Sequence, residues 1–437
     1  MTTQQTSKYA NWFRDSTPYI SAHRGRTFVV LLDGDALEHE NLDNIVHDLA
    51  LLQVLDVRVV LVHGARPQID AALGETTFHQ NRRITGPSEM QQILGLFGTL
   101  RSRLEALFST GLPTSPLHNA DIAVVSGNFV VAQPIGVLDG VDHQLTGKTR
   151  RVHTERVRAA LDAGALVLLS PVGYSPSGQA FNLAADELAA DMAVALAADK
   201  LITFDADGYA RDESGQPVTE LSPTAADSLL DQANMAETTR SHLTAMLRAV
   251  RGGVKRAHLV SFTQDGALLG ELFTARGQGT QISETLRDLI RPAMADDLAG
   301  IVALIRPLEE SGVLVRRSRD RLEQEMERFL VAEIDGIVVG CCAIYAFDEC
   351  AELACVAVHD SYRNANDDLG LGSHLLEAAE HTARAAGFKQ LFVLTTQTRD
   401  WFLEKGFVEA GADSLPAPKQ ALYNYQRNAK VLTKTLA

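Results

Sequence analysis

The sequence predicts two consecutive α/β domains, a three-layer sandwich around a mainly parallel sheet and then a smaller domain with its own mixed elements. The three-layer sandwich is predicted by continuous apolar runs that are typical of buried parallel strands: FVVLL, RVVLVHG, IAVVSG, ALVLLSPVG, KLITFD and AHLVSF. Helical patterns alternate with these runs, as in Asp186–Ala198 and Ser241–Val250. The pattern changes around GQGTQISETLRDLIRPA, which indicates a boundary.

Length and composition agree with two globular domains. A chain of 437 residues exceeds one ordinary core, and 46% hydrophobic with 22% charged residues is typical of a folded protein. We expect a first domain at residues 1–282, a linker at 283–290 and a second domain at 291–437.

The net charge and the composition of the N-terminal segment restrict the expected partners and location of the protein. A formal net charge of -15 disfavours nucleic acid and anionic membranes as partners. The polar N-terminus lacks a signal peptide, and no stretch has the length of a membrane span, so we expect a cytoplasmic protein. The four cysteines lack zinc-ligand spacing, so we expect no metal.

The second domain has a recognisable order of elements. Helices are expected near Ala295–Leu308 and Asp320–Arg328, and a hairpin at VAEIDGIVVGCCAIYAF turns at Asp335-Gly336. The strand ELACVAV, the loop and helix DDLGLGSHLL, the strand LFVLTT, a short helix at DWFLEKG and a final strand follow.

The loop before the predicted helix is a candidate phosphate site. A helix N-terminus presents free N–H groups and a positive dipole end, which favour a phosphate. Gly370 and Gly372 would let the backbone approach that phosphate. Taken alone, glycines in such a loop indicate a turn more often than a ligand site.

The whole order resembles the GNAT family of acyl-CoA N-acetyltransferases, over roughly residues 290–437. The stretch VAVHDSYRNANDDLGLGSHLL resembles that family's CoA-binding motif, and WFLEKGF resembles its last helix and strand. Asp367 departs from the family's usual Gln or Arg, which affects one side-chain contact to the pyrophosphate. The resemblance implies acetyl-CoA contacts from Val356, Ala357, Val358, Leu369, Gly370, Leu371, Gly372 and Ser373.

Direct transfer to an amine requires three groups. These are a base for the protonated amine, N–H donors for the oxyanion and a proton source for the thiolate. Glu352 is our candidate base, with Glu333, Asp348 and Glu349 as rivals. Thr395 is a candidate for the proton source, although a structural role explains it equally well. Backbone N–H groups near Cys355 and Val356 are expected to polarise the thioester.

A run of arginines is a candidate acceptor site. Arg supplies paired hydrogen bonds to carboxylates, and VRRSRDRLE places Arg316, Arg317, Arg319 and Arg321 together. YNYQRNAK adds Arg427 and Lys430. From composition alone such a run is as readily a solvated face, so the acceptor stays open at this point.

Several long segments together resemble the bacterial N-acetylglutamate synthase family across nearly the whole chain. They are RPLEESGVLVRRSRDRLE, ELACVAVHDSYR, LFVLTTQTRDWFLEKGF and LYNYQRNAKVL. The resemblance implies acetyl transfer from acetyl-CoA to glutamate, the first step of arginine biosynthesis. It implies that Arg317 and Arg427 hold the glutamate carboxylates, with Arg319 in reserve and Cys355 beside the substrate. Ala429 stands where related enzymes can have serine.

The first domain resembles the amino acid kinase family in LVHGARPQI and FNLAADELAADMAVALAADKLITFDADG. The lysine usual in the first strand is Leu31, and Asp33-Gly34 replaces the paired glycines. The Gly-rich turn carries Ala65-Arg66. A carboxylate facing triphosphate is repulsive, so although Asp186 is retained we expect a pseudokinase.

HLVSFTQDGALLGELFTARGQGT resembles the arginine site of arginine-inhibited acetylglutamate kinases. The resemblance implies that Glu271 binds the cationic ligand, with His258, Tyr19 and carbonyls near Gly277 and Gly279. The N-terminal segment with Trp12 and Phe13 resembles the helix that joins dimers into hexamers in such relatives, although a locally docked helix would also explain it.

Three other functions compete with an arginine-inhibited acetyltransferase. A bifunctional synthase and kinase is disfavoured by the missing lysine. An arginine-binding regulatory protein with an inactive GNAT domain has only the Asp367 departure in its favour. A protein acetyltransferase would require an open peptide groove.

Overall fold

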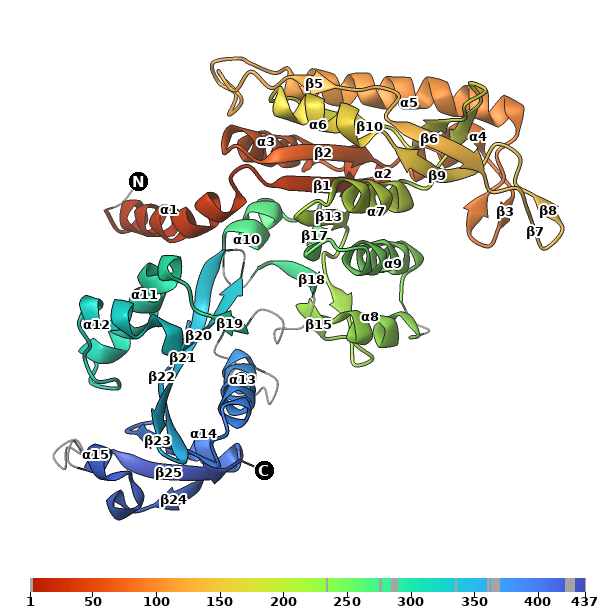
Figure 1. Ribbon diagram of the computed structural model, residues 1–437. Coiled ribbons are helices and arrows are strands. Elements are labelled where there is room, and N and C mark those ends of the chain that lie inside the picture. Colours follow the sequence, from red (N-terminus) through yellow and green to blue (C-terminus); the bar gives the residue numbers. More distant parts are fainter. Residues whose placement is uncertain are drawn as a thin grey trace. The chain divides into compact units, whose positions relative to one another are not determined.

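The computed structural model describes residues 3–232, 235–274, 277–283, 290–334, 336–359, 362, 370–420 and 429–436. The chain divides into two compact units, residues 1–284 and 285–437 (Figure 1). Most of the predicted linker, residues 284–289, lies outside the described residues, as does Asp335 of the predicted hairpin turn.

An eight-stranded sheet organises the first unit, in the order β16-β18-β17-β13-β1-β2-β10-β5. Every neighbouring pair is parallel except β17 with β18. The strands are β1 (Thr27–Leu32), β2 (Arg58–His63), β5 (Val124–Val125), β10 (Leu166–Leu169), β13 (Lys200–Asp205), β16 (Glu220–Leu221), β17 (Arg256–Ser261) and β18 (Gly279–Ser283). The predicted strand IAVVSG is reduced to two residues at the sheet edge.

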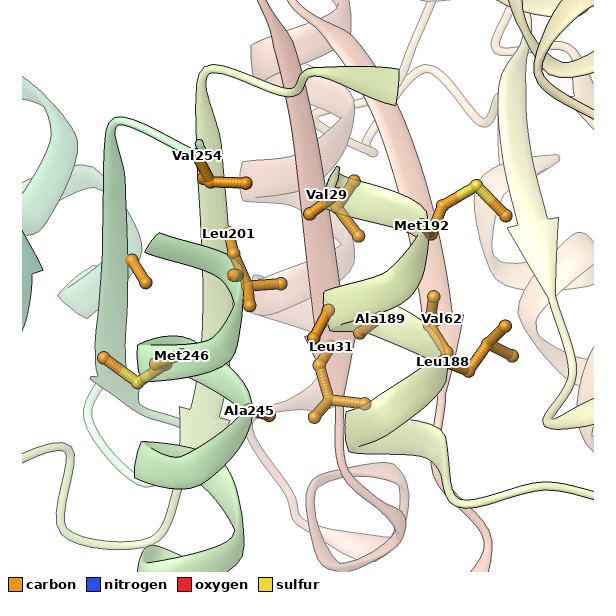
Figure 2. Packing of buried hydrophobic residues seen from close by; sticks show 14 of the residues in the cluster. Val29, Leu31, Val62, Leu188, Ala189, Met192, Leu201, Ala245, Met246 and Val254 are labelled. Carbon is orange, nitrogen blue, oxygen red and sulfur yellow. The ribbon is translucent and has the colours of Figure 1, made fainter. Parts of the chain in front are cut away.

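Both faces of this sheet are buried, which confirms the three-layer sandwich. Alternate β1 side chains point to opposite faces. Val29 and Leu31 pack against α7 (Ala185–Leu196) and α9 (Glu237–Arg251), as Figure 2 shows. Phe28 and Val30 pack against α3 (Leu42–Val54) and α5 (Pro87–Phe108). Burial on both faces explains why the strands read as continuous apolar runs.

Shorter elements complete the first unit. A second sheet contains β12 (Ala180–Asn182), β11 (Val172–Tyr174), β6 (Val130–Pro134) and β9 (Gly147–Val152). The remaining helices are α1 (Thr3–His23), α2 (Gly34–Glu38), α4 (Arg66–Leu73), α6 (Thr154–Asp162), α8 (Pro223–Leu230) and α10 (Ala267–Phe273).

A seven-stranded mixed sheet organises the second unit, in the order β19-β20-β21-β22-β23-β25-β24. In the described part of this mixed sheet, only β22 and β23 pair in parallel. The strands are β19 (Ile290–Pro292), β20 (Phe329–Ile334), β21 (Ile337–Phe347), β22 (Cys350–Val358), β23 (Gln390–Thr395), β24 (Val408–Ala410) and β25 (Lys430–Thr435).

Helices cover both faces of the mixed sheet. The helix α13 (Leu371–Ala385) packs into one core cluster, and α11 (Leu298–Glu310) and α12 (Arg319–Gln324) contribute to another. The contact with α13 is close, because a Cβ added at Gly340 of β21 would lie 2.8 Å from Leu375 Cδ1. The last predicted helix before the hairpin ends earlier than expected, and a 3₁₀ turn at Met326–Arg328 replaces its final part.

No helix in the described part of the chain is long and apolar enough to cross a membrane. The same residues contain no cluster of three or more His, Cys, Asp or Glu side chains that could hold a metal ion.

Candidate active site

The site of the second unit lies along β22, where this strand separates from β23. The two strands pair only from Cys350–Glu352 to Gln390–Phe392. Beyond that point, β22 contains a bulge, because Cys341 is opposite Ala357 while Ala343 is opposite Ala354. Cys355 accommodates the extra residue with a left-handed φ of 52°. A bulge interrupts the ladder and redirects backbone groups, and this one lies where the thioester-polarising N–H groups are predicted.

Glu352 is the buried carboxylate of this region. It is 6% exposed, and its Oε2 accepts a hydrogen bond of 2.6 Å from Lys419 Nζ of the short helix α15 (Ala417–Gln420). Its rivals differ in exposure and pairing: Asp348 and Glu349 are exposed, and Glu333 is paired with an arginine of β19. Burial and position at the strand separation therefore favour Glu352 over the other three carboxylates.

Arg317 lies in the same region, near Cys355, Tyr345 and Glu352. The Arg317 Nη1 donates to the Val315 carbonyl at 3.0 Å, and the Arg317 guanidinium carbon is 6.0 Å from the Tyr345 ring centroid. Burial alone would lower the pKa of Arg317, but Cys355, Tyr345 and Glu352 raise it. Arg319 is the exposed first residue of α12. Arg427, the other predicted carboxylate ligand, is outside the described residues.

Tyr345 is a site residue that sequence reasoning missed. It is directly opposite Glu352 in the β21–β22 register, and its hydroxyl donates to Glu325 Oε2 at 2.7 Å. Burial and this carboxylate raise the pKa of Tyr345, so the phenol stays protonated. The Arg328 guanidinium also lies 5.2 Å from the ring centroid. A tyrosine within a hairpin strand carries no recognisable sequence signal, since only strand pairing brings it to Glu352.

Cys355 and Thr395 are both buried, in different local settings. Burial raises the pKa of the Cys355 thiol to about 11, so the thiol is neutral near pH 7 and suited to packing. The Thr395 hydroxyl shares a 2.8 Å hydrogen bond with the Thr398 hydroxyl and accepts from the Thr398 N–H at 3.0 Å. Thr395 therefore caps the turn after β23, and its hydroxyl has a partner that can relay a proton.

The predicted CoA loop leads into the N-terminus of the 15-residue helix α13. Gly370 is its N-cap, and the Gly370 carbonyl accepts from the Ser373 N–H at 2.9 Å. Gly372 has more room for a side chain than expected, because an added Cβ would meet its nearest atom, on Trp401, at an ordinary contact distance of 3.4 Å. Leu369 and Asp367 fall outside the described residues. Leu371, Ser373, Ala357 and Val358 are buried, and Val356 is half-buried.

The first unit contains a cavity of about 320 Å³ at the carboxyl end of β1, with Leu31, Asp33, Arg82, Asp186 and His242 among its lining residues. The Leu31 side chain belongs to the apolar core, so this wall lacks the lysine that a phosphoryl-transfer site requires.

A buried charge cluster occupies one side of this cavity. His242 of α9 forms ion pairs with Asp33 at 3.6 Å and with Asp205 at 3.2 Å. Burial alone would lower the pKa of His242, but the two carboxylates raise it to about 9. His242 in turn lowers the pKa of Asp33 and of Asp205 against their burial. Asp33 and His242 of this cluster line the cavity, so a carboxylate lies in the wall where the pseudokinase interpretation expects repulsion of a phosphate group.

The structure brings three of the predicted arginine-site residues together. His258 Nδ1 is 2.6 Å from Glu271 Oε1, and the Gln278 N–H donates to Glu271 Oε2 at 2.6 Å. Gly277 has a φ of 63°, and an added Cβ would lie 2.4 Å from Glu271 Oε2. Burial works against the charge of Glu271, but His258 and the Gln278 N–H lower its pKa, so the carboxylate is ionised.

Three further residues surround this group. Lys200 Nζ, a buried cation that sequence reasoning missed, is 3.4 Å from His258 Nε2. Gly279 pairs closely with β17, because an added Cβ would lie 2.1 Å from the Leu259 carbonyl oxygen. Tyr19 packs against the core from α1, and α1 contacts α10, the helix that carries Glu271.

These two units match two protein families. Residues 26–261 match the amino acid kinase family, and residues 298–405 match the acetyltransferase (GNAT) family. The fold and the site therefore define a kinase-like domain followed by an acetyltransferase domain. The chain is 47% identical to an amino-acid acetyltransferase of Pseudomonas fluorescens over 435 residues, covering 98% of this chain and 100% of that one. A relative of the same description in Azotobacter vinelandii is also 47% identical, covering 98% and 99%. The chain belongs to the amino-acid acetyltransferase family, which confirms the resemblance.

Two solved structures are similar along the same length. Crystal structures of N-acetylglutamate synthase from Neisseria gonorrhoeae contain coenzyme A with L-arginine in one case and coenzyme A with N-acetyl-glutamate in the other. The first is 37% identical with a TM-score of 0.83, and the second 36% with 0.63. Each comparison covers 98% of this chain and 99% of the other.

Proposed function

We propose that the chain transfers the acetyl group of acetyl-CoA to the α-amino group of glutamate, forming N-acetyl-L-glutamate and CoA as the first step of arginine biosynthesis. The observation that carries this proposal is the buried Glu352 carboxylate beside Arg317, at the point where β22 separates from β23. Similar N-acetylglutamate synthase structures with coenzyme A and N-acetyl-glutamate support it.

The reaction needs no covalent enzyme intermediate. Glu352 removes a proton from the substrate ammonium, and the resulting amine attacks the thioester carbonyl while the carbon–nitrogen bond forms. Backbone N–H groups at the bulge around Cys355 and Val356 stabilise the oxyanion. The carbon–sulfur bond then breaks, the nitrogen loses its second proton and the CoA thiolate gains one. The Thr395 and Thr398 hydroxyl pair is the candidate relay between the nitrogen and the thiolate, so both hydroxyls end protonated.

Recognition of glutamate depends on cations that match carboxylates. Arg317 is the first candidate, because Tyr345 supports its guanidinium near Cys355 and Glu352. Arg427 is proposed as the second and Arg319 is held in reserve. Ala429 is buried directly before β25 and offers no hydroxyl to the substrate.

Acetyl-CoA is proposed to bind along β22 and at the N-terminus of α13, through backbone groups from Val356 to Val358 and from Leu369 to Ser373. The helix end supplies N–H groups and a positive dipole for the pyrophosphate. No metal is required in this scheme.

L-Arginine is proposed as a feedback inhibitor that binds at the first unit. The ionised Glu271 is suited to a guanidinium or ammonium group, with His258, Tyr19 and the carbonyls near Gly277 and Gly279. The exposed Trp12 and Phe13 of α1 are proposed to join subunits into a hexamer, and the protein to act in the cytoplasm.

One experiment tests the proposal. Purified protein is mixed with acetyl-CoA and each of the twenty amino acids, and the free CoA thiol is followed with and without arginine. We expect thiol release with glutamate alone and its suppression by arginine. Release with no arginine effect would remove only the inhibitor assignment. If none of the twenty amino acids causes thiol release, the acetyl transfer to an amino acid is overturned.

A further inference from the structure

The ion pair of Glu352 with Lys419 is not explained by the reaction scheme. A base that accepts a proton from the substrate ammonium group is itself hydrogen-bonded to a lysine ammonium group. Glu352 Oε2 and Lys419 Nζ are 2.6 Å apart, and the two side chains are 8% and 21% exposed. A buried carboxylate needs a countercharge, because leaving it unpaired in a site of low dielectric is strongly destabilising.

In the described part of the chain Arg317 also lies near Glu352, but Lys419 is the cation that donates a hydrogen bond to this carboxylate. Arg317 donates to a backbone carbonyl and lies against Tyr345, whose hydroxyl donates to Glu325. The Cys355 thiol is protonated, because burial raises its pKa to about 11. Among the residues that the structure describes, the groups near this carboxylate from β21, β22, α11, α12, α15 and the connecting turns are Tyr345, Cys355, Glu309, Arg317, Glu325 and Lys419.

We propose that Lys419 occupies the amine subsite in the empty enzyme, and that the α-ammonium group of the acceptor displaces it from Glu352. This inference rests on the proposed function. The lysine and substrate ammonium groups have the same charge and the same donor chemistry. Lys419 comes from a four-residue helix, and its flexible stem can withdraw without unfolding a larger element. The exchange keeps the buried carboxylate paired before and after binding.

Displacement has a kinetic consequence that a permanent ion pair lacks. In Lys419→Met no lysine competes with the acceptor ammonium group for Glu352, so we expect KM for glutamate to fall severalfold. Loss of a purely structural ion pair would not tighten the binding of glutamate.

Two variants serve as controls. Lys419→Arg keeps a competing cation and should retain the KM of the wild type. Lys389→Met removes the corresponding partner of an exposed ion pair, Lys389 with Glu349 at 3.1 Å, and should leave KM for glutamate unchanged. Coenzyme A binding by calorimetry shows whether each variant retains a folded acetyltransferase domain.

A measurement on the wild type keeps the inference testable if Lys419→Met does not fold. Trace labelling with acetic anhydride, followed by mass spectrometry, compares the reactivity of Lys419 relative to that of Lys389 with and without glutamate, with no CoA present. We expect glutamate to raise the labelling of Lys419 severalfold and to leave that of Lys389 unchanged.

The outcomes separate the two proposals. A lower KM for glutamate in Lys419→Met, with increased labelling of Lys419 in the wild type, supports displacement. An unchanged or higher KM in that variant overturns it, as does unchanged or decreased labelling of Lys419. A wild-type protein that transfers no acetyl group to glutamate shows instead that the proposed function fails, before any variant is made.

Discussion

Replacing His242 by Gln should destabilise the first unit in a strongly pH-dependent way. His242 is 4% exposed and lies between Asp33 and Asp205. Its pKa rises from 6.5 to about 9, which corresponds to about 3 kcal/mol of coupling to the folded state at roughly 1.36 kcal/mol per unit. Glutamine keeps a similar size and hydrogen-bonding capacity but cannot carry the charge.

The sign follows from the direction of the pKa change. Because the folded-state pKa is raised, this stabilisation is fully present below about pH 6.5 and is lost as the pH rises through about 9. Linkage then gives about 3 kcal/mol at pH 6, about 1.5 at pH 8 and less than about 0.5 at pH 9. The lowered pKa values of Asp33 and Asp205 contribute at the acid end, where their stabilisation is lost as the pH falls.

Urea unfolding of both proteins at pH 6, 8 and 9, followed by circular dichroism, measures the difference in free energy of unfolding at each pH. Comparing variant with wild type cancels the titration of unchanged groups. The exposed histidine variant His118→Gln is the control and should show no comparable trend. A His242→Gln difference that stays constant from pH 6 to 9 would refute the assignment of a buried imidazolium.

Three other predictions concern the proposed ligand sites and their packing. Arg317→Lys should raise KM for glutamate about tenfold or more, because lysine cannot form the paired hydrogen bonds of a guanidinium, and steady-state kinetics measure this. Gly277→Ala should abolish arginine inhibition, since the φ of 63° and the nearby carboxylate leave no room for a methyl group, and inhibition curves check it. Gly340→Ala should destabilise the second unit by about 1–3 kcal/mol, because the methyl group overpacks against α13, and thermal melting detects it.

Each of these changes has a comparison that isolates its cause. Arg319→Lys should leave KM for glutamate near the wild-type value, and a larger effect there than at Arg317 would reverse our assignment. Gly277→Ala must keep its glutamate activity, because loss of both properties would indicate misfolding. Gly372→Ala should melt like the wild type, since its added methyl group meets ordinary contacts. Equal melting of the two glycine variants would contradict the packing argument.

The apolar runs in the sequence predicted the fold class, because each run reflects how a strand is buried. The runs FVVLL and RVVLVHG are continuous because β1 and β2 are buried on both faces. The resemblance to the GNAT family also placed Glu352, Arg317 and the loop before α13 in one domain, since the order of motifs along a chain can be compared without coordinates. The loss of the kinase lysine was visible directly as Leu31.

Contacts between distant segments required the tertiary structure. Tyr345 meets Glu352 only through the register of β21 with β22, and Lys419 reaches the same carboxylate from 67 residues away. His242 becomes a buried cation because α9 places it between two strand ends.

The sequence alone determined the two-domain α/β architecture, the family and the residue types available for chemistry, because periodicity and motif order are local properties. The tertiary structure decided which arginine of the run approaches Glu352, which carboxylate is buried and which cations neutralise the buried acids. Those properties depend on strand register and on burial, and both arise only when segments far apart in the chain pack together.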